Sequence, residues 1–200
     1  MMVTSTLVAC SDGAHETQDV DQDATPALTC TPVAPRASRK LIDHALWTLV
    51  PTAADPWAEF RPQEDISCSD AARLTEDFGG LPAYNINTVQ CSYTTVVQPT
   101  LADACKGETF YVWLWNFALT GPPDAVVHAA VQLGDDALWQ AEKAIPAVAG
   151  LVIDRIVLKH DVPAGTPIYF HLRNHGANQY DLLDLTIVNP DPDVPPGPPL

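Results

Sequence analysis

The sequence predicts an all-β fold, an antiparallel β-sandwich or jelly roll with disordered N- and C-terminal tails. Runs rich in aromatic and β-branched residues recur through residues 40–188. Turn-forming residues separate these runs roughly every 8–12 positions, and helical periodicity is scarce. The length of 200 residues fits one domain of ordinary size plus tails. We therefore expect the sandwich domain at 40–188.

The predicted strands are clearest in the second half of the chain. The run 107–117 is dense in aromatic and β-branched residues, which suit a pleated sheet. Gly134-Asp135-Asp136 separates two alternating runs, 125–133 and 137–145, and this arrangement predicts a β-hairpin. Further strands are expected at 151–160, 168–175 and 181–188.

The first half of the domain is less regular. Residues 69–76 fit a short helix that begins at a serine N-cap and ends at Gly79-Gly80. The alternation of residues 74–78 fits a strand edge equally well, so both interpretations stay open. Residues 84–97 are predicted to be extended.

The chain has five cysteines, an odd number that leaves one thiol to explain in an exported protein. If Cys10 has another role, the remaining four allow three disulfide pairings, and the sequence does not choose among them. We favour Cys68 with Cys91, because the two bracket one segment, and consequently Cys30 with Cys105.

The four residues Leu7-Val8-Ala9-Cys10 resemble the lipobox of bacterial lipoproteins. This resemblance implies that a signal peptidase cuts before Cys10, that the Cys10 sulfur carries a lipid, and that residues 1–10 are the remnant of a signal peptide. It places the protein in the cell envelope, anchored to the outer membrane, or outside the cell. Residues 1–9 lack Lys and Arg and are shorter than a full signal peptide. Either translation starts further upstream or the resemblance is accidental, and the odd cysteine count favours an upstream start. The alternatives to a lipidated Cys10 are a trimmed ordinary signal sequence and a free cysteine.

Charge and composition describe the two tails and restrict the partners. With 25 acidic and 10 basic residues the net charge is -15, which argues against nucleic acid because such a surface repels phosphate. Residues 11–39 are acidic, contain prolines and lack apolar periodicity, so we expect a disordered tether. The proline-rich segment 189–200 is expected to be a disordered tail. No run of 18 apolar residues predicts a membrane span.

Strand alternation gives the run 107–117 two apolar faces. Exposed aromatic rings stack on the apolar faces of sugars, so an aromatic row is a candidate glycan platform. The competing interpretation is a central strand buried on both sides. One face would carry Tyr111, Trp113, Trp115 and Phe117, and the other Phe110, Val112, Leu114 and Asn116.

A second candidate site consists of histidines. His171, Arg173 and His175 share one strand face, and Asn116 and His128 converge with them if their strands are neighbours. Imidazole is a common metal ligand, but His171 and His175 are about 13 Å apart on an extended strand. We therefore expect hydrogen-bonded or solvated histidines, leave metal binding open, and predict no cofactor.

Catalytic motifs are missing from the sequence. It has no Gly-x-Ser-x-Gly elbow, no phosphate-binding glycine loop and no cysteine in a recognisable nucleophile context. Carboxylate pairs carry little information in a chain this acidic. A hydrolase that depends on a metal or on two carboxylates is kept as an alternative.

The last two predicted strands resemble the C-terminal strands of jelly-roll carbohydrate-binding modules. A Pro-Ala-Gly turn leads into the strand 168–175, the loop 176–180 follows, and 181–187 forms the last strand. None of that family's ligand-binding aromatics matches a position here, so no binding residue is transferred. The leading hypothesis is a lipid-anchored, non-catalytic head that binds a glycan. The rival is a structural or assembly lipoprotein that binds an envelope protein. The proposed ligand-binding residues are Trp113, Trp115, His171, Arg173 and His175.

Overall fold

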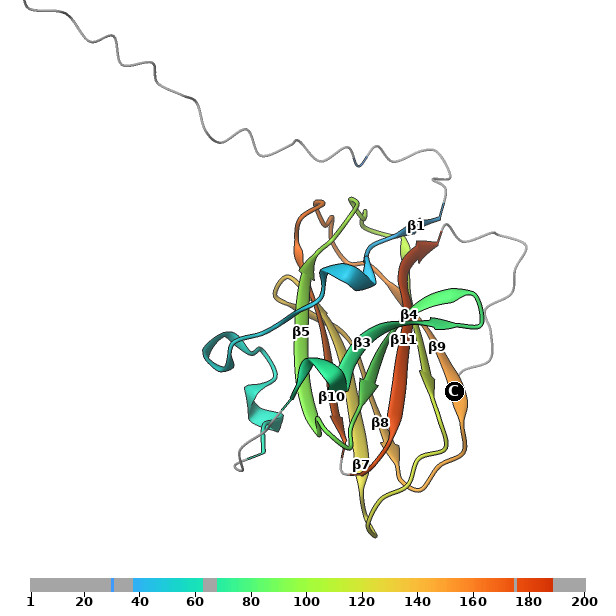
Figure 1. Ribbon diagram of the computed structural model, residues 1–200. Coiled ribbons are helices and arrows are strands. Elements are labelled where there is room, and N and C mark those ends of the chain that lie inside the picture. The colour runs from blue at the N-terminus through green and yellow to red at the C-terminus, as the bar shows by residue number, and fades with distance from the viewer. Residues whose placement is uncertain (1–29, 31–37, 63–67, 175, 189–200) are drawn as a thin grey trace, which may run out of the picture.

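The computed structural model describes residues 30, 38–62, 68–174 and 176–188, and it shows two antiparallel sheets facing each other (Figure 1). The predicted all-β sandwich is confirmed. Sheet A has the strand order β3-β4-β11-β6-β9, with β1 paired to β11 beyond the end of β4, and sheet B has the order β2-β5-β10-β7-β8. Among the described residues, no helix is long and apolar enough to cross a membrane.

The strands of sheet A are β1 (Arg39–Lys40), β3 (Arg73–Phe78), β4 (Leu81–Asn87), β6 (Thr109–Asn116), β9 (Gly150–Val157) and β11 (Gln179–Val188). Those of sheet B are β2 (Thr48–Leu49), β5 (Tyr93–Pro99), β7 (Val126–Leu133), β8 (Asp136–Ala144) and β10 (Pro167–Asn174). Single turns of 3-10 helix lie at His44–Leu46, Thr52–Ala54, Ala58–Phe60 and Asp70–Ala72.

The predicted strands of the second half are confirmed, including the β7–β8 hairpin, whose turn residue Gly134 has a positive φ of 57°. The run 84–97 is extended but divided, because a turn at residues 88–92 sends β4 and β5 into different sheets. In 69–76, a helical turn covers only Asp70–Ala72 and strand β3 then begins. Gly79 and Gly80 form the β3–β4 turn, not a helix end; both have a positive φ, which glycine adopts without strain.

The core lies between the sheets and follows the predicted alternation. Phe110 and Val112 of β6 point inward from sheet A, and Ile168, Phe170 and Leu172 of β10 point inward from sheet B; all five are fully buried. Because successive strand residues face opposite sides, the residues between them lie on the outer faces of the sandwich. Those outer faces hold the candidate sites.

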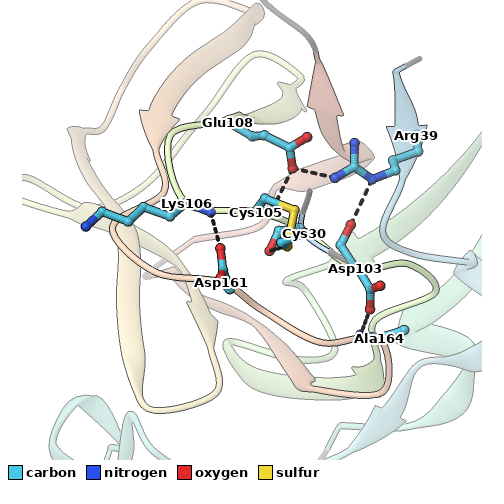
Figure 2. Close-up of a disulfide and its surroundings, with 9 residues drawn as sticks. Cys30, Arg39, Asp103, Cys105, Lys106, Glu108, Asp161 and Ala164 are labelled. Carbon is cyan, nitrogen blue, oxygen red and sulfur yellow. Dashed lines mark hydrogen bonds and ion pairs between the residues drawn. A yellow bond between two sulfur atoms is a disulfide. The ribbon is translucent and has the colours of Figure 1, made fainter. Parts of the chain in front are cut away.

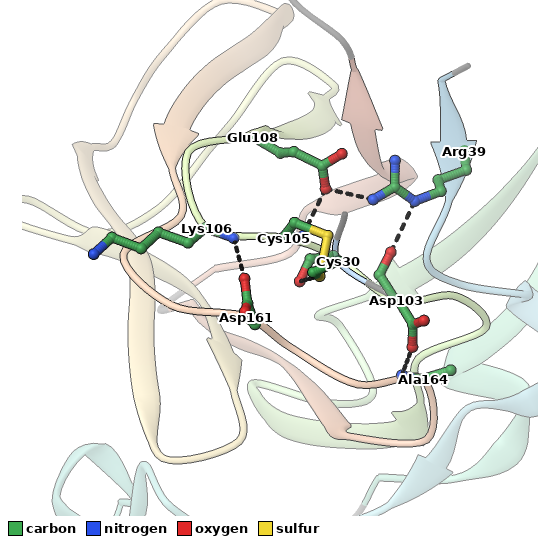
Figure 3. A network of polar contacts seen from close by, with 9 residues as sticks. Cys30, Arg39, Asp103, Cys105, Lys106, Glu108, Asp161 and Ala164 are labelled. Carbon is green, nitrogen blue, oxygen red and sulfur yellow. Dashed lines mark hydrogen bonds and ion pairs between the residues drawn. A yellow bond between two sulfur atoms is a disulfide. The ribbon is translucent and has the colours of Figure 1, made fainter. Parts of the chain in front are cut away.

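Both favoured disulfides form, Cys30 with Cys105 and Cys68 with Cys91. Around the first, Arg39 donates to the carbonyl of Asp103 and to the carboxylate of Glu108, which also accepts from the backbone N–H of Cys105 (Figures 2 and 3). This network joins β1 to the loop that precedes β6. The predicted signal-peptide remnant 1–10, the predicted tether 11–39 except residues 30, 38 and 39, and the predicted tail 189–200 lie outside the described residues.

Candidate functional site

The outer face of sheet A carries an aromatic strip, defined as Tyr111, Trp113, Trp115 and Phe117. Its first three members are half-buried, and the Phe117 side chain is 38% exposed. The other face of β6 is buried, because Phe110, Val112, Leu114 and Asn116 point into the sandwich. Strand β6 is therefore internal in its sheet, but only one of its faces is closed.

Apolar and charged groups flank the strip on the neighbouring strands. Leu151 and Ile153 of β9 lie opposite Trp115 and Trp113, with 39% and 37% of their surface exposed. Arg155 of β9 lies over the ring of Tyr111, 5.2 Å from its centroid, in a cation–π contact. On the β11 side, Asp184 is the cross-strand neighbour of Trp113 and forms an ion pair with Lys40 at 3.0 Å.

The β3–β4 hairpin adds a fifth aromatic ring that the sequence did not indicate. Its tip crosses in front of β11 in Figure 1, and Phe78 contacts Trp115 and Phe117 with ring centroids 5.5 Å and 6.5 Å apart. Pairing of β4 with β11 ends at Tyr84. Beyond that point the hairpin is not paired with β11, and it lies over the outer face of the sheet.

A buried carboxylate lies beside Trp115. Asp181 of β11 is the cross-strand neighbour of both Trp115 and Asn85, and it has no exposed surface. The Asn85 amide donates to Asp181 at 2.7 Å and to Glu76 at 3.1 Å, so it links the two carboxylates. Burial raises the pKa of the Asp181 carboxyl to about 6; the bond from Asn85 opposes this rise, and the nearby Glu76 carboxylate adds to it.

The outer face of sheet B is covered. Residues 51–62, named here the lid segment, lie over β5, β7 and β10, and Trp57 and Phe60 contact the rings of His128 and His171. The two imidazole centroids are 5.2 Å apart. Burial, with the added influence of His128 and Arg173, lowers the pKa of His171 to about 3, so this imidazole is neutral.

The lid segment is fixed by polar contacts at one end. The Tyr93 hydroxyl donates to the Asp55 carboxylate at 2.6 Å and to the Trp57 carbonyl at 2.9 Å, and Arg61 lies 3.7 Å from Asp55. A cavity of about 310 Å³ opens beside these groups and reaches Thr94. This cavity belongs to the edge of the lid, away from the aromatic strip, which lies on the other sheet.

The predicted site residues therefore fall on two opposite faces. Trp113 and Trp115 lie on the outer face of sheet A, whereas His171 and Arg173 belong to β10 of sheet B. The expected meeting of His128 and His171 occurs, because β7 and β10 are neighbours. Asn116 does not join them, because its side chain points between the sheets. Its amide donates to the backbone carbonyls of Phe117 and Val148, and its Oδ1 accepts from Lys143. His175 lies outside the described residues.

The described residues offer little for a metal. Their one group of three metal-type ligands is Cys30, Cys105 and Asp161, in which the two cysteines are already joined in a disulfide. His128 and His171 have no third such ligand beside them in this part of the chain.

No protein-family description matches the chain, and no curated protein matches it. Solved structures to which the chain is similar include several carbohydrate-binding modules. The module TmCBM61, solved in complex with β-1,4-galactotriose, is 10% identical with a TM-score of 0.40, over 62% of this chain and 87% of that one. A family 29 module is 14% identical with a TM-score of 0.37, over 60% and 80%.

The enzymatically active domain of tailspike protein 4 from bacteriophage CBA120 is 13% identical with a TM-score of 0.44. The match covers 73% of this chain but only 20% of the tailspike chain. At these identities and scores, no ligand or residue role is transferred from any of the three structures. The functional argument rests on the outer face of sheet A alone.

Proposed function

We propose that the protein is a non-catalytic binding module that binds a glycan on the outer face of sheet A. The observation that carries this proposal is the row of half-buried rings formed by Tyr111, Trp113 and Trp115 on the outer face of the sheet. Alternate residues of one strand are about 7 Å apart, so a sugar chain lying along β6 meets one ring after another. The apolar faces of pyranose rings stack on such aromatic rings.

The surroundings of the strip supply what a sugar needs besides stacking. Leu151 and Ile153 extend the apolar surface on one side. Lys40, Asp184 and Arg155 place hydrogen-bonding groups at its edges, within reach of hydroxyl groups. The histidine face of sheet B is closed by the lid segment, which leaves sheet A as the accessible aromatic face.

Glycan binding is tested with the full chain on a glycan array, followed by calorimetry with the oligosaccharides that bind. Trp113→Ala and Trp115→Ala are each expected to weaken binding tenfold or more, because each removes one stacking ring. Val126→Ala is the control: Val126 is 38% exposed, as is Phe117 of the strip, but it belongs to sheet B. The absence of binding by the wild type, or unchanged binding by a Trp113→Ala/Trp115→Ala double variant, would refute the proposal.

We also propose that Cys10 carries the lipid that anchors the head to the cell envelope. The two disulfides use Cys30, Cys68, Cys91 and Cys105, so Cys10 is the one cysteine of the sequence outside both pairs. Disulfides are typical of proteins that fold in an oxidising compartment outside the cytoplasm, which supports export. The lipobox resemblance then accounts for the fifth thiol.

Lipidation is tested by expressing the chain in bacteria fed an alkyne-labelled fatty acid. Wild type is expected to carry the label and to sediment with membranes, whereas Cys10→Ala is expected to lose both properties. A wild-type chain that stays unlabelled would contradict the anchor and leave the glycan proposal intact.

A further inference from the structure

Two neighbouring polar atoms on the outer face of sheet A have no hydrogen-bond partner among the described residues. They are the indole Nε1 of Trp115 and the carboxylate Oδ2 of Asp181, and both are shielded from solvent. Trp115 and Asp181 are paired across β6 and β11, so their side chains emerge side by side on the same face. One atom is an N–H donor and the other is an acceptor, a pair that a single hydroxyl group satisfies.

The buried position of the Asp181 carboxylate destabilises the fold, which is unexpected for a residue with only a structural role. Asp181 is fully buried, accepts a hydrogen bond from Asn85 and interacts with the Glu76 carboxyl group, and the described ion pairs do not include it. The nearest titratable group is Glu76, which carries the same charge. Burying a carboxylate without a counter-ion destabilises a fold, and such groups concentrate at functional sites.

The pair is covered by the tip of the β3–β4 hairpin, which is not paired with β11. Phe78 packs on Trp115 from the tip of the β3–β4 hairpin. Hydrogen bonding of β4 to β11 stops at the pair Tyr84 and Leu182, next to an irregularity between Leu182 and Asp184. The tip is therefore held over the face by side-chain contacts and not by the sheet.

We propose that Trp115 and Asp181 form the receptor for one hydroxyl group of a neutral glycan, which enters when the tip of the β3–β4 hairpin moves aside. The hydroxyl donates to Oδ2 of Asp181 and accepts from Nε1 of Trp115, while its sugar ring stacks on the aromatic strip. This inference rests on the proposed glycan binding and adds the polar contact that selects the ligand.

The charges facing the receptor define the class of glycan. Glu76 and Asp181 lie at the Trp115 end of the strip, and Asp184 is neutralised by Lys40. The cation Arg155 lies at the Tyr111 end, about 13 Å further along β6 by strand spacing. A uronate or sulfate group at the Trp115 end meets like charge, so uncharged chains are favoured there.

Two conservative variants test the receptor in the full chain. Trp115→Phe keeps an aromatic ring but removes the N–H, and Asp181→Asn keeps the size of the side chain but removes the charge. Each is expected to weaken binding of a neutral β-1,4-linked hexaose of glucose, mannose or galactose fivefold or more. Because both groups bind the same hydroxyl, the double variant is expected to lose less than the product of the single losses. Asp135→Asn, in the exposed β7–β8 turn of sheet B, is the control and is expected to change affinity less than twofold.

Thermal unfolding separates a receptor from a structural role. Asp181→Asn removes a buried charge, so its unfolding midpoint at pH 7.5 is expected to equal or exceed that of the wild type while its affinity falls. A lowered midpoint with unchanged affinity would show that Asp181 serves the fold and would overturn the receptor. Phe78→Ala is expected to speed association, because it removes the covering ring, and a slower association would overturn the moving hairpin.

The outcomes also separate this inference from the glycan proposal on which it rests. If Trp113→Ala abolishes binding while Trp115→Phe and Asp181→Asn bind as the wild type does, the receptor is wrong and the glycan platform stands. If the wild type binds none of the neutral hexaoses or array glycans, the platform itself is wrong. Mannuronate hexaose is the C6-oxidised counterpart of mannohexaose, and equal affinity for the two would overturn the selectivity.

Discussion

Phe60 lies face to face with His128, with ring centroids 4.2 Å apart and ring planes 14° apart. Beside this stack, Trp57 lies over His171 at 5.7 Å with planes 23° apart. Two rings from the lid segment thus cover two histidines that a bare sheet would expose to water. The outer face of sheet B is consequently a small second core, and its stability depends on keeping the His171 imidazole uncharged.

We predict that the folded state weakens as the pH falls below about 6.5. The pKa of His171 is about 3 in the folded chain but near 6.5 when unfolded, so between these values the unfolded chain binds the extra proton. This contribution to stability is complete above pH 6.5 and is lost progressively towards pH 3. Between pH 7 and 4.5 we expect a loss of about 2 to 3 kcal/mol in the free energy of unfolding from this residue.

The measurement is urea unfolding at both pH values for the wild type and for His171→Gln, which lacks the titrating group. The titratable and charged groups that act on or contact His171 are His128, Arg173 and Tyr93, and all of them are retained in the variant. His160→Gln is the control, because His160 is exposed and pairs with Asp136. If His171→Gln loses as much stability on acidification as the wild type, or if NMR shows His171 protonated at pH 6, the explanation fails.

Trp57 is predicted to be the main support of the lid segment. It is 4% exposed and contacts His128, His171 and Phe60, so Trp57→Ala leaves a large void and admits water to both imidazoles. We expect a loss of about 3 kcal/mol in the free energy of unfolding. The pKa of His171, followed by NMR, is expected to rise towards its ordinary value as the ring becomes hydrated.

The control for Trp57→Ala is Leu49→Ala, because Leu49 of β2 is 43% exposed and its loss is expected to cost less than about 0.5 kcal/mol. Equal stability of the two variants would mean that the lid segment contributes nothing to the fold.

The parts of the fold that could be predicted are those with a two-residue period. The alternation in 168–175 placed His171 and Arg173 opposite Phe170 and Leu172, and the sheet has them so. The lid segment could not be predicted, because residues 51–62 have no period and their partners lie on strands remote in the chain. A polar face of a strand does not reveal whether another segment covers it.

Only part of the candidate site could be predicted, because the two-residue period places residues on the faces of one strand but does not show which strands are neighbours. Trp113 and Trp115 follow from alternation within one strand, whereas Asp181 and Phe78 reach them through strand order and the bend of a hairpin. Strand order is set by long-range pairing, which local patterns do not encode. The signal available in the sequence was the presence of two acidic residues, Asp181 and Asp184, in the otherwise apolar run 180–185.

The two disulfides are predicted to contribute unequally. In the chain-entropy description, closing the 75-residue separation of Cys30 and Cys105 stabilises the fold by about 4 to 5 kcal/mol, and the 23-residue separation of Cys68 and Cys91 by about 3 kcal/mol. The double alanine variant of each pair, unfolded in urea without reductant, measures the two contributions. The opposite ranking would mean that contacts around Cys91, which is buried, outweigh loop entropy.

Glu108 is predicted to hold β1 to the sandwich. Its carboxylate accepts from both Arg39 and the backbone N–H of Cys105 (Figure 3), and the Arg39 and Glu108 side chains are 19% and 18% exposed. Glu108→Gln keeps an acceptor for Cys105 but loses the ion pair, which we expect to cost about 0.5 to 1 kcal/mol. Glu108→Ala also leaves the Cys105 N–H and the Arg39 guanidinium without this partner, so about 2 kcal/mol is expected.

Urea unfolding of both Glu108 variants measures the two losses, and hydrogen exchange at Lys40 and Leu41 reports whether β1 has detached from β11. Asp70→Asn is the control, because Asp70 pairs with Arg73 from a fully exposed position and no change in the unfolding midpoint is expected. In 1 M NaCl the difference between wild type and Glu108→Gln should shrink, since salt screens the partly exposed ion pair. Equal stability of Glu108→Ala and Glu108→Gln would show that the Cys105 N–H finds another acceptor, and β1 would then be held by its pairing with β11 alone.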